Sequence, residues 1–233
     1  IPILNALAAE TTGTVTATMS NVTAAQADNL TTTATDSITI TLNAATFSAT
    51  QLLSIDIKTS VAVNATNITG ITGTIGQIEA ARASAGITTD TNYTATASGI
   101  ITNTTDLTSL NSIAGETSGK VTARVDGNLA YLSGMNTAGT DDITVNINSA
   151  EVATATALTN LDGKTNIAVN ANSINTITGT AAAILATYTA AAAGTITGLN
   201  DESVTITDTT INAALLNTLD SYTTGEVNAA SVT

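Results

Sequence analysis

The chain has 233 residues and a net charge of −13, from 18 Asp and Glu against 5 Lys and Arg, and it contains no Cys, His or Trp. Without thiol and imidazole groups it has no cysteine or histidine nucleophile, no general base that titrates near pH 7, and no ordinary zinc, copper or haem site. Five basic residues are too few for a nucleic-acid-binding surface. A 43% share of hydrophobic residues with 10% charged residues favours a folded chain. The most apolar stretch, 180–196, is too short and too polar for a membrane span.

A repeat of 106 residues organises the chain. The sequence LNAL at 4–7 returns as LNSI at 110–113 and as LNTL at 216–219. Residues 52–74 align without a gap on 158–180, with 13 identities over 23 positions. We therefore expect blocks at about 4–109 and 110–215 and the start of a third block at 216.

Nine short strands are predicted in chain order, because nine runs carry apolar residues at their first and third positions and mostly polar ones between and after them. In the eighth run, 196–199 competes with 204 for the strand. The runs begin at Val15, Ile38, Val61, Tyr93, Val121, Ile143, Ile167, Val204 and Val227.

Helices are predicted between these strands, where apolar residues recur at intervals of three and four. Several of the segments begin with Thr or Asn in an N-cap position and several end at Gly. The predicted helical segments are 46–56, 73–86, 105–115, 128–135, 151–163, 179–194 and 209–220.

One short strand and one short helix per unit of roughly 23 residues cannot bury an apolar face alone, so neighbouring units must stack. The sequence therefore predicts a single continuous α/β solenoid over 1–233, with about nine coils and parallel strands; the alternative is a pure β-solenoid. The first residues already match the repeat at 110, and the last run, 227–233, stops within a unit. Both ends are therefore expected to be open, to the rest of a longer chain or to copies stacked end to end.

Three segments, 173–180, 199–210 and 216–231, resemble the tandem repeats of giant Thr- and Ala-rich cell-surface proteins of marine cyanobacteria. The resemblance implies a secreted, very long, non-enzymatic protein displayed at the cell surface, and it supplies no catalytic residues. Phage tail fibres of such hosts carry similar repeats, which leaves the source open.

The function expected from these features is structural: a segment of an extracellular sheath, surface layer, adhesion stalk or filament, with no catalytic residue and no cofactor. The alternative is a module of a phage tail fibre or a glycan-binding adhesin, which would show a cluster of aromatic or acidic side chains. Polysaccharide-cleaving enzymes also use solenoids and need such a cluster. The aromatic residues, no two of them close in sequence, are Phe47, Tyr93, Tyr131, Tyr188 and Tyr222.

Carboxylates are the only candidate metal ligands in quantity. Two adjacent pairs, Asp141-Asp142 and Asp201-Glu202, stand at or just before the start of a predicted strand. Calcium binding by these four residues is one hypothesis, because calcium prefers carboxylate oxygens; solvated turns are the other. The glycine-and-aspartate loop of calcium-binding repeat toxins is missing.

Threonine pairs of the form T-x-T suggest a less favoured hypothesis, an ice-binding face. They occur at 16/18, 39/41, 94/96 and 205/207, and Asn64, Arg124, Asn146 and Ala168 interrupt the array. Thr also simply suits an exposed strand face. Sequons at Asn21, Asn67 and Asn92 make glycans possible partners.

Overall fold

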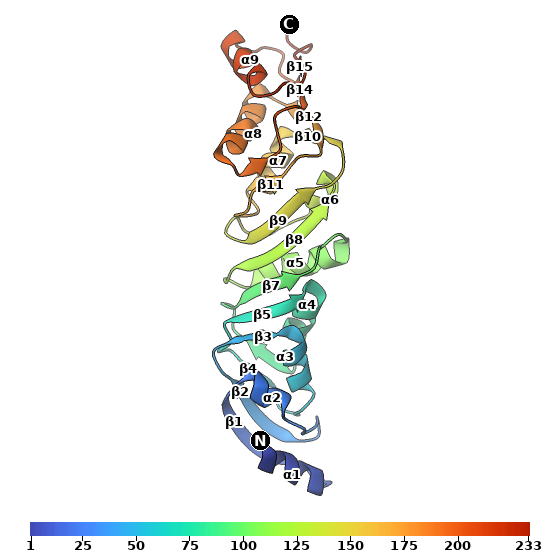
Figure 1. Cartoon of the computed structure of the whole chain (residues 1–233), viewed down its shortest axis with the longest axis vertical. Coiled ribbons are helices and arrows are strands. Elements are labelled where there is room, and N and C mark those ends of the chain that lie inside the picture. The colour runs from blue at the N-terminus through green and yellow to red at the C-terminus, as the bar shows by residue number, and fades with distance from the viewer. The chain divides into compact units, whose positions relative to one another are not determined.

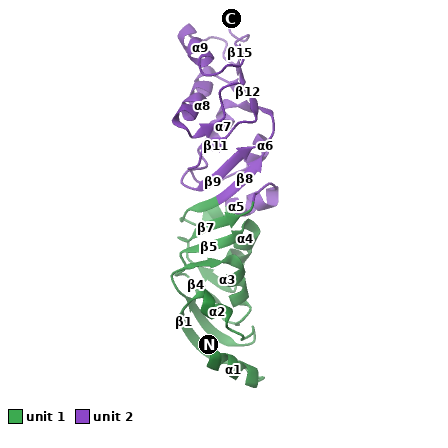
Figure 2. Cartoon of the chain, in the orientation of Figure 1, with its two compact units in different colours: residues 1–99, 112–122 green, residues 100–111, 123–233 purple.

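The computed structural model describes all 233 residues, as an α/β fold with nine helices and three sheets whose strands are all parallel (Figure 1). The chain divides into two compact units, shown in Figure 2. Unit 1 comprises residues 1–99 and 112–122, and unit 2 comprises residues 100–111 and 123–233.

Unit 1 contains a complete four-stranded sheet in the order β1-β2-β4-β6 and the strands β3-β5-β7 of a seven-stranded sheet. Its strands are β1 (Thr16–Val22), β2 (Ser37–Leu42), β3 (Thr46–Ser48), β4 (Val63–Ala65), β5 (Gly70–Thr74), β6 (Ile87–Thr89) and β7 (Thr94–Ser98). Its helices are α1 (Pro2–Glu10), α2 (Ala24–Asp28), α3 (Ala49–Asp56) and α4 (Ile75–Ala83).

Unit 2 contains the four-stranded sheet β10-β12-β14-β15 and the order β8-β9-β11-β13 of the seven-stranded sheet. The helix α5 (Thr104–Glu116) and the strand β8 (Val121–Gly127) each have residues in both units. The remaining elements are α6 (Leu129–Leu132), β9 (Asp142–Ile147), β10 (Glu151–Thr154), α7 (Ala155–Asp162), β11 (Val169–Asn170), β12 (Ile174–Gly179), α8 (Ala181–Ala193), β13 (Ile196–Thr197), β14 (Ser203–Ile206), α9 (Ala213–Asp220) and β15 (Val227–Asn228).

Aliphatic side chains, mainly Ile, Leu, Val and Ala, form the core of each unit. The strands β2 and β9 have the same alternation, in which every second side chain is buried, as expected for strands with one face in the core. The helices α3 and α7, which lie one full repeat apart in the sequence, each bury two large side chains, Leu52 with Ile55 and Leu158 with Leu161. The repeat of the sequence is therefore also a repeat of buried positions.

Hydroxyl side chains cap the N-termini of five helices, at residues other than those where the predicted helical segments begin. Thr23, Ser48 and Thr74 each accept a hydrogen bond from the backbone N–H of a Gln three residues later, and that Gln side chain bonds back to the cap. These capping boxes satisfy donors that the first turn of a helix leaves free. Thr154 and Thr180 cap α7 and α8 with a single bond each.

All nine predicted strand runs contain a strand. The prediction of one strand per unit is wrong, because the chain has fifteen strands. The competing segments 196–199 and 204 both form strands, β13 and β14. Two predicted helices, 46–56 and 151–163, begin instead with the strands β3 and β10 and become helical only from Ala49 and Ala155. The other additional strands are β5, β6 and β12, and helices also form at α1 and α2.

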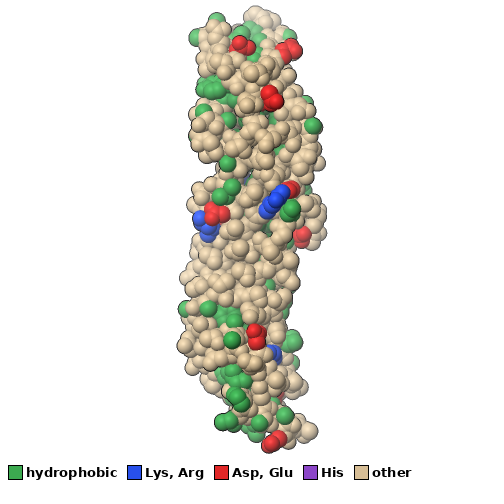
Figure 3. All heavy atoms as spheres, in the orientation of Figure 1, with side chains coloured by type: hydrophobic (Ala, Val, Ile, Leu, Met, Phe, Trp, Pro, Cys, Tyr) green, Lys and Arg blue, Asp and Glu red, His purple; other side chains and the backbone are tan.

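Charged side chains are sparse on the face of the protein shown in Figure 3, where most of the surface is uncharged. No helix of the chain combines the length and the apolar character needed to cross a membrane.

Candidate functional site

Buried threonine hydroxyls join consecutive segments of the chain at repeated positions. The Thr59 hydroxyl donates to the carbonyl of Ile38 (2.6 Å) and accepts from the backbone N–H of Ile38 (3.0 Å). Thr165, its equivalent in the next repeat, makes the same two bonds to Ile143 (2.6 and 3.1 Å). Thr117 and Thr223 form a second such pair, in which each hydroxyl donates to a backbone carbonyl, that of Tyr93 or of Glu202. Each hydroxyl satisfies backbone groups that would otherwise be buried without partners.

Asparagine side chains on two helices, α1 and α5, join each helix to the turn after the next helix in the chain. In unit 1, the amide of Asn5 donates to the carbonyl of Asn29 (2.7 Å), and its oxygen accepts from the N–H of Thr31 (3.0 Å). In unit 2, Asn111 makes the same pair of bonds to the Gly134 carbonyl (2.8 Å) and the Asn136 N–H (2.7 Å). These side chains therefore tie together segments of backbone that are distant in the sequence.

Rows of polar side chains cross the paired strands of each unit. In unit 1, the strand registers place four hydroxyls side by side: Ser48, Thr72, Thr96 and Thr122. In unit 2, the equivalent row is Thr154, Thr178, Thr205 and Asn228. Neighbouring side chains in such a row are separated by the strand spacing, about 4.8 Å.

The T-x-T pairs of the ice-binding hypothesis do not share one sheet. The pairs 16/18 and 39/41 lie on β1 and β2, whereas 94/96 lies on β7 in another sheet. Thr205 lies on β14 in the third sheet, and Thr207 follows the end of that strand. The rows that form across strands are therefore different from those expected from the sequence.

Of the first calcium candidates, Asp142 is the first residue of β9 and Asp141 lies just before it. Asp141 is buried, and one of its oxygens accepts from the N–H of Ala138 (2.9 Å) and closes the turn before the strand. Asp36 in unit 1 closes its own turn through the N–H of Thr33 (3.0 Å). The Asp142 carboxylate accepts from the side chain of Asn166 (3.3 Å).

In the second pair of calcium candidates, one side chain is exposed and the other is buried. Asp201 is exposed, whereas Glu202 is 1% exposed and accepts from the Tyr188 hydroxyl and from the N–H of Asp201 (3.2 Å). Burial, and then the hydrogen bond to Glu202, hold the pKa of Tyr188 far above its ordinary value. No group of three or more acidic side chains in the protein is close enough together to hold a metal ion.

An aromatic pair that the sequence did not predict lies beside Glu202. The rings of Tyr188 and Tyr222 stack with centroids 5.1 Å apart and planes within 6°. Tyr188 is buried, whereas Tyr222 keeps 36% of its surface exposed. The two residues are distant in the sequence, so only the packing of α8 against the turn after α9 brings them together.

In unit 1, charged residues occupy the positions equivalent to this aromatic pair. Arg82 and Glu116, the equivalents of Tyr188 and Tyr222 in the preceding repeat, form an ion pair. The Arg82 guanidinium also binds Glu79 at 2.6 Å, and these bonds raise its pKa. Tyr93 stands in the position before its strand that Glu202 occupies in unit 2, and its buried hydroxyl has no hydrogen-bond partner.

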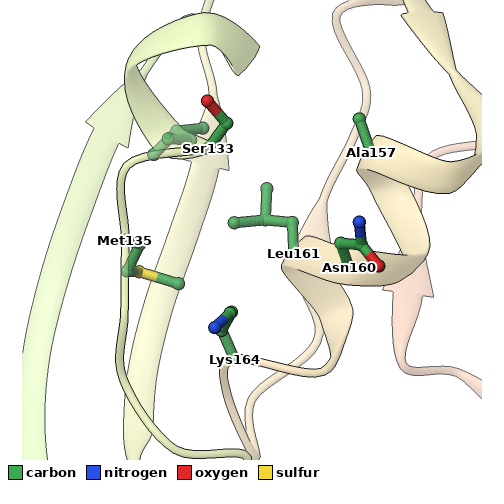
Figure 4. A pocket seen from close by; sticks show the side chains of 7 residues that line it. Ser133, Met135, Ala157, Asn160, Leu161 and Lys164 are labelled. Carbon is green, nitrogen blue, oxygen red and sulfur yellow. The ribbon is translucent and has the colours of Figure 1, made fainter.

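A small pocket of about 140 Å³ lies between α6 and α7 in unit 2 (Figure 4). Its charged group is Lys164, whose Nζ donates to the side chain of Asn136 (3.2 Å). In unit 1, Gln51 stands where Ala157 lines this pocket, and its side chain reaches Asp28 (3.2 Å). The pocket thus follows from a smaller residue at one repeat position. Its lining residues are Leu132, Ser133, Met135, Ala157, Asn160, Leu161 and Lys164.

The three sequon asparagines, Asn21, Asn67 and Asn92, are all exposed. Comparison of the chain with protein-family models, with curated proteins and with solved structures finds no match. The contacts that recur in both units therefore provide the main guide to function. They join segment to segment along the chain, and the sequence signal that could have located them is the recurrence of Thr59, Thr117 and Asn5 one repeat later.

Proposed function

We propose that the chain is a non-enzymatic structural repeat segment of an extracellular surface assembly, such as a sheath, a surface layer, an adhesion stalk or a filament. In this proposal its strands and helices form an α/β solenoid whose superrepeat is the long repeat of the sequence. The assembly would lengthen by duplication of that block, since each segment of a solenoid contacts only its neighbours.

One observation carries the proposal: the bonds that join consecutive segments recur at the spacing of the repeat. Asn5 and Asn111 make the same pair of bonds, and so do Thr59 and Thr165. In each repeat, these side chains bind backbone groups of another segment of the chain. Such recurrent contacts between segments favour a mechanical role. The resemblance to giant cell-surface repeat proteins supports the same role outside the cell.

Immunogold electron microscopy of native cells, with antibody raised against residues 1–233, tests this function. We expect gold particles at the cell surface or on extended extracellular structures. Antibody depleted on the purified chain is the control, because it should lose the signal. Labelling confined to the cytoplasm would contradict the proposal.

A glycan-binding adhesin or phage tail-fibre module is the second candidate, and the Tyr188–Tyr222 stack favours it. An exposed aromatic ring can bind the apolar face of a sugar, and Tyr222 presents such a ring. Screening of a glycan array with the chain and with Tyr222→Ala tests this candidate. Binding that the substitution removes, or gold labelling on virion fibres, would favour it over the structural role.

A further inference from the structure

The pocket between α6 and α7 lies where the two units differ at equivalent positions. In unit 1, the Gln51 side chain of α3 donates to the Asp28 carboxylate of α2 (3.2 Å) and so bridges the two helices. The asparagine bonds from α1 and α5 align the turns after α2 and α6, so Ser133 is the equivalent of Asp28. Ala157 is the equivalent of Gln51. Unit 2 therefore has a short side chain on each side of the gap that unit 1 bridges.

The lysine at this place also has different partners in the two units. In unit 1, Lys58 donates from Nζ to the carbonyls of Ala27 (2.9 Å) and Asp28 (3.2 Å). Its equivalent, Lys164, lines the pocket and donates from Nζ to the side-chain oxygen of Asn136 (3.2 Å). No carboxylate of the chain forms an ion pair with Lys164. Its ammonium has three N–H donors and one neutral acceptor, which leaves it open to an anion.

The rest of the lining is mostly apolar. Leu132 and Met135 line the pocket from α6 and the turn after it, and Leu161 lines it from α7. In Figure 4 the side chains of Met135 and Leu161 point toward one another, and Lys164 lies next to them. Asn160, four residues before Lys164, also lines the pocket, and its exposed side chain makes no hydrogen bond within the chain. An ammonium and an amide therefore accompany an apolar space.

Volume and charge together indicate the class of ligand. The pocket has a volume of about 140 Å³. An engineered protein cavity of about 150 Å³ binds benzene, so an apolar group of about six carbons fits here. Ammonium and amide N–H groups both donate to a carboxylate. No acidic side chain lines the pocket, so a ligand amine would have no counter-charge there.

We propose that this pocket binds a small monocarboxylate whose body is an apolar group of about six carbons. Its carboxylate accepts from Lys164 Nζ and from the Asn160 amide, and its body packs on Leu132, Met135 and Leu161. The net charge of −13 repels anions in general, so a carboxylate binds only where local donors hold it. Such binding needs no location outside the cell, so its test is separate from that of the proposed function.

Benzoate is the probe, and benzamide is its uncharged counterpart of the same shape. Methyl NMR of the whole chain follows a titration up to about 50 mM. We expect benzoate to shift the methyl signals of Leu132, Met135 and Leu161 with a Kd on the order of 1 mM. Benzamide should bind about fivefold more weakly or worse, because it lacks the charge. Sodium chloride at equal ionic strength is the control for screening.

The chain's own repeat supplies the variant that closes the pocket. Ala157→Gln combined with Ser133→Asp restores the two side chains that bridge the equivalent gap in unit 1. We expect this double variant to weaken benzoate binding about tenfold or more. Lys164→Met removes the ammonium and keeps an unbranched apolar side chain, so it should weaken benzoate about tenfold and leave benzamide unchanged. The matched control in unit 1, Lys58→Met, should leave benzoate binding unchanged.

Three results would overturn the proposal. The first is the absence of methyl shifts at about 50 mM benzoate. The second is equal affinity for benzoate and benzamide, which would remove the role of the carboxylate. The third is unchanged benzoate affinity in Lys164→Met, which provides the test by itself if the double variant does not fold.

Discussion

At the scale of single residues, the two units place different chemistry in one repeat position. Unit 1 uses the ion pair Arg82–Glu116, and unit 2 uses the stacked rings of Tyr188 and Tyr222. The third member also differs, since Glu202 accepts a bond from Tyr188, whereas the Tyr93 hydroxyl is buried without a partner. Substitutions at one position of the repeat have therefore been matched by substitutions at its neighbours.

Replacing each of these tyrosines by Phe compares the loss of a hydrogen-bonded hydroxyl, that of Tyr188, with the loss of a buried hydroxyl that has no partner, that of Tyr93. Tyr188→Phe leaves the buried Glu202 oxygen without its donor, so we expect a loss of about 1–3 kcal/mol in the free energy of unfolding. Tyr93→Phe removes a hydroxyl that has no partner, and we expect no loss, or a gain of up to about 1 kcal/mol. Urea unfolding followed by circular dichroism measures both. Equal losses in the two variants would contradict this account.

At the scale of elements, the Asp36 carboxylate joins β1 to the turn before β2. It accepts from the N–H groups of Thr33 and Val15, both at 3.0 Å. These bonds, that of Thr33 first, hold the pKa of Asp36 below its ordinary value. The carboxylate therefore stabilises the fold only while it is ionised.

We expect low pH to weaken the contact that the Asp36 carboxylate makes with the N–H groups of Thr33 and Val15. Since the pKa of Asp36 is lower in the folded chain than in the unfolded one, its contribution is complete above the unfolded value, near 4, and is lost as the pH falls below it. Asp36→Asn should be less stable than the parent at pH 7, and the difference should shrink as the pH approaches 3. Amide hydrogen exchange of β1 and β2 measures this. A difference that does not change with pH would contradict the assignment.

The sequence predicts elements best where the local pattern is sufficient. The nine alternating runs all contain a strand, because alternation reports a strand with one buried face. β3 and β6 are missed because each contains only one apolar residue, Phe47 or Ile87, so neither shows the alternation. The predicted helix at 46–56 contained β3, because Ser48 both ends a strand and caps a helix.

The side-chain contacts of the candidate site were harder to predict from the sequence than the helices and strands. The repeat gives the positions of Thr117 and Asn111, but the carbonyl and N–H groups they bind belong to other segments and carry no sequence signal. The Tyr188–Tyr222 stack was missed for the same reason, since the two rings are distant in sequence. Of the calcium candidates, Asp201 and Glu202 are adjacent in sequence, yet one is exposed and the other buried.

At the scale of the whole molecule, the excess of 18 acidic over 5 basic side chains sets how stability responds to salt. Like charges repel most in the compact state, and screening reduces this repulsion. We expect the free energy of unfolding to rise by on the order of 1 kcal/mol between about 0.01 M and about 0.2 M NaCl, measured by urea unfolding at low protein concentration.

A variant with three exposed carboxylates replaced, Glu10→Gln, Asp201→Asn and Asp220→Asn, should respond less to NaCl, because it carries less charge to screen. A fall in stability with NaCl would contradict the repulsion argument. Calcium chloride at equal ionic strength separates screening from binding. Specific sites stabilise the state that binds, so a larger rise in calcium that Asp141→Asn or Asp201→Asn removes would identify the site among the four candidate carboxylates.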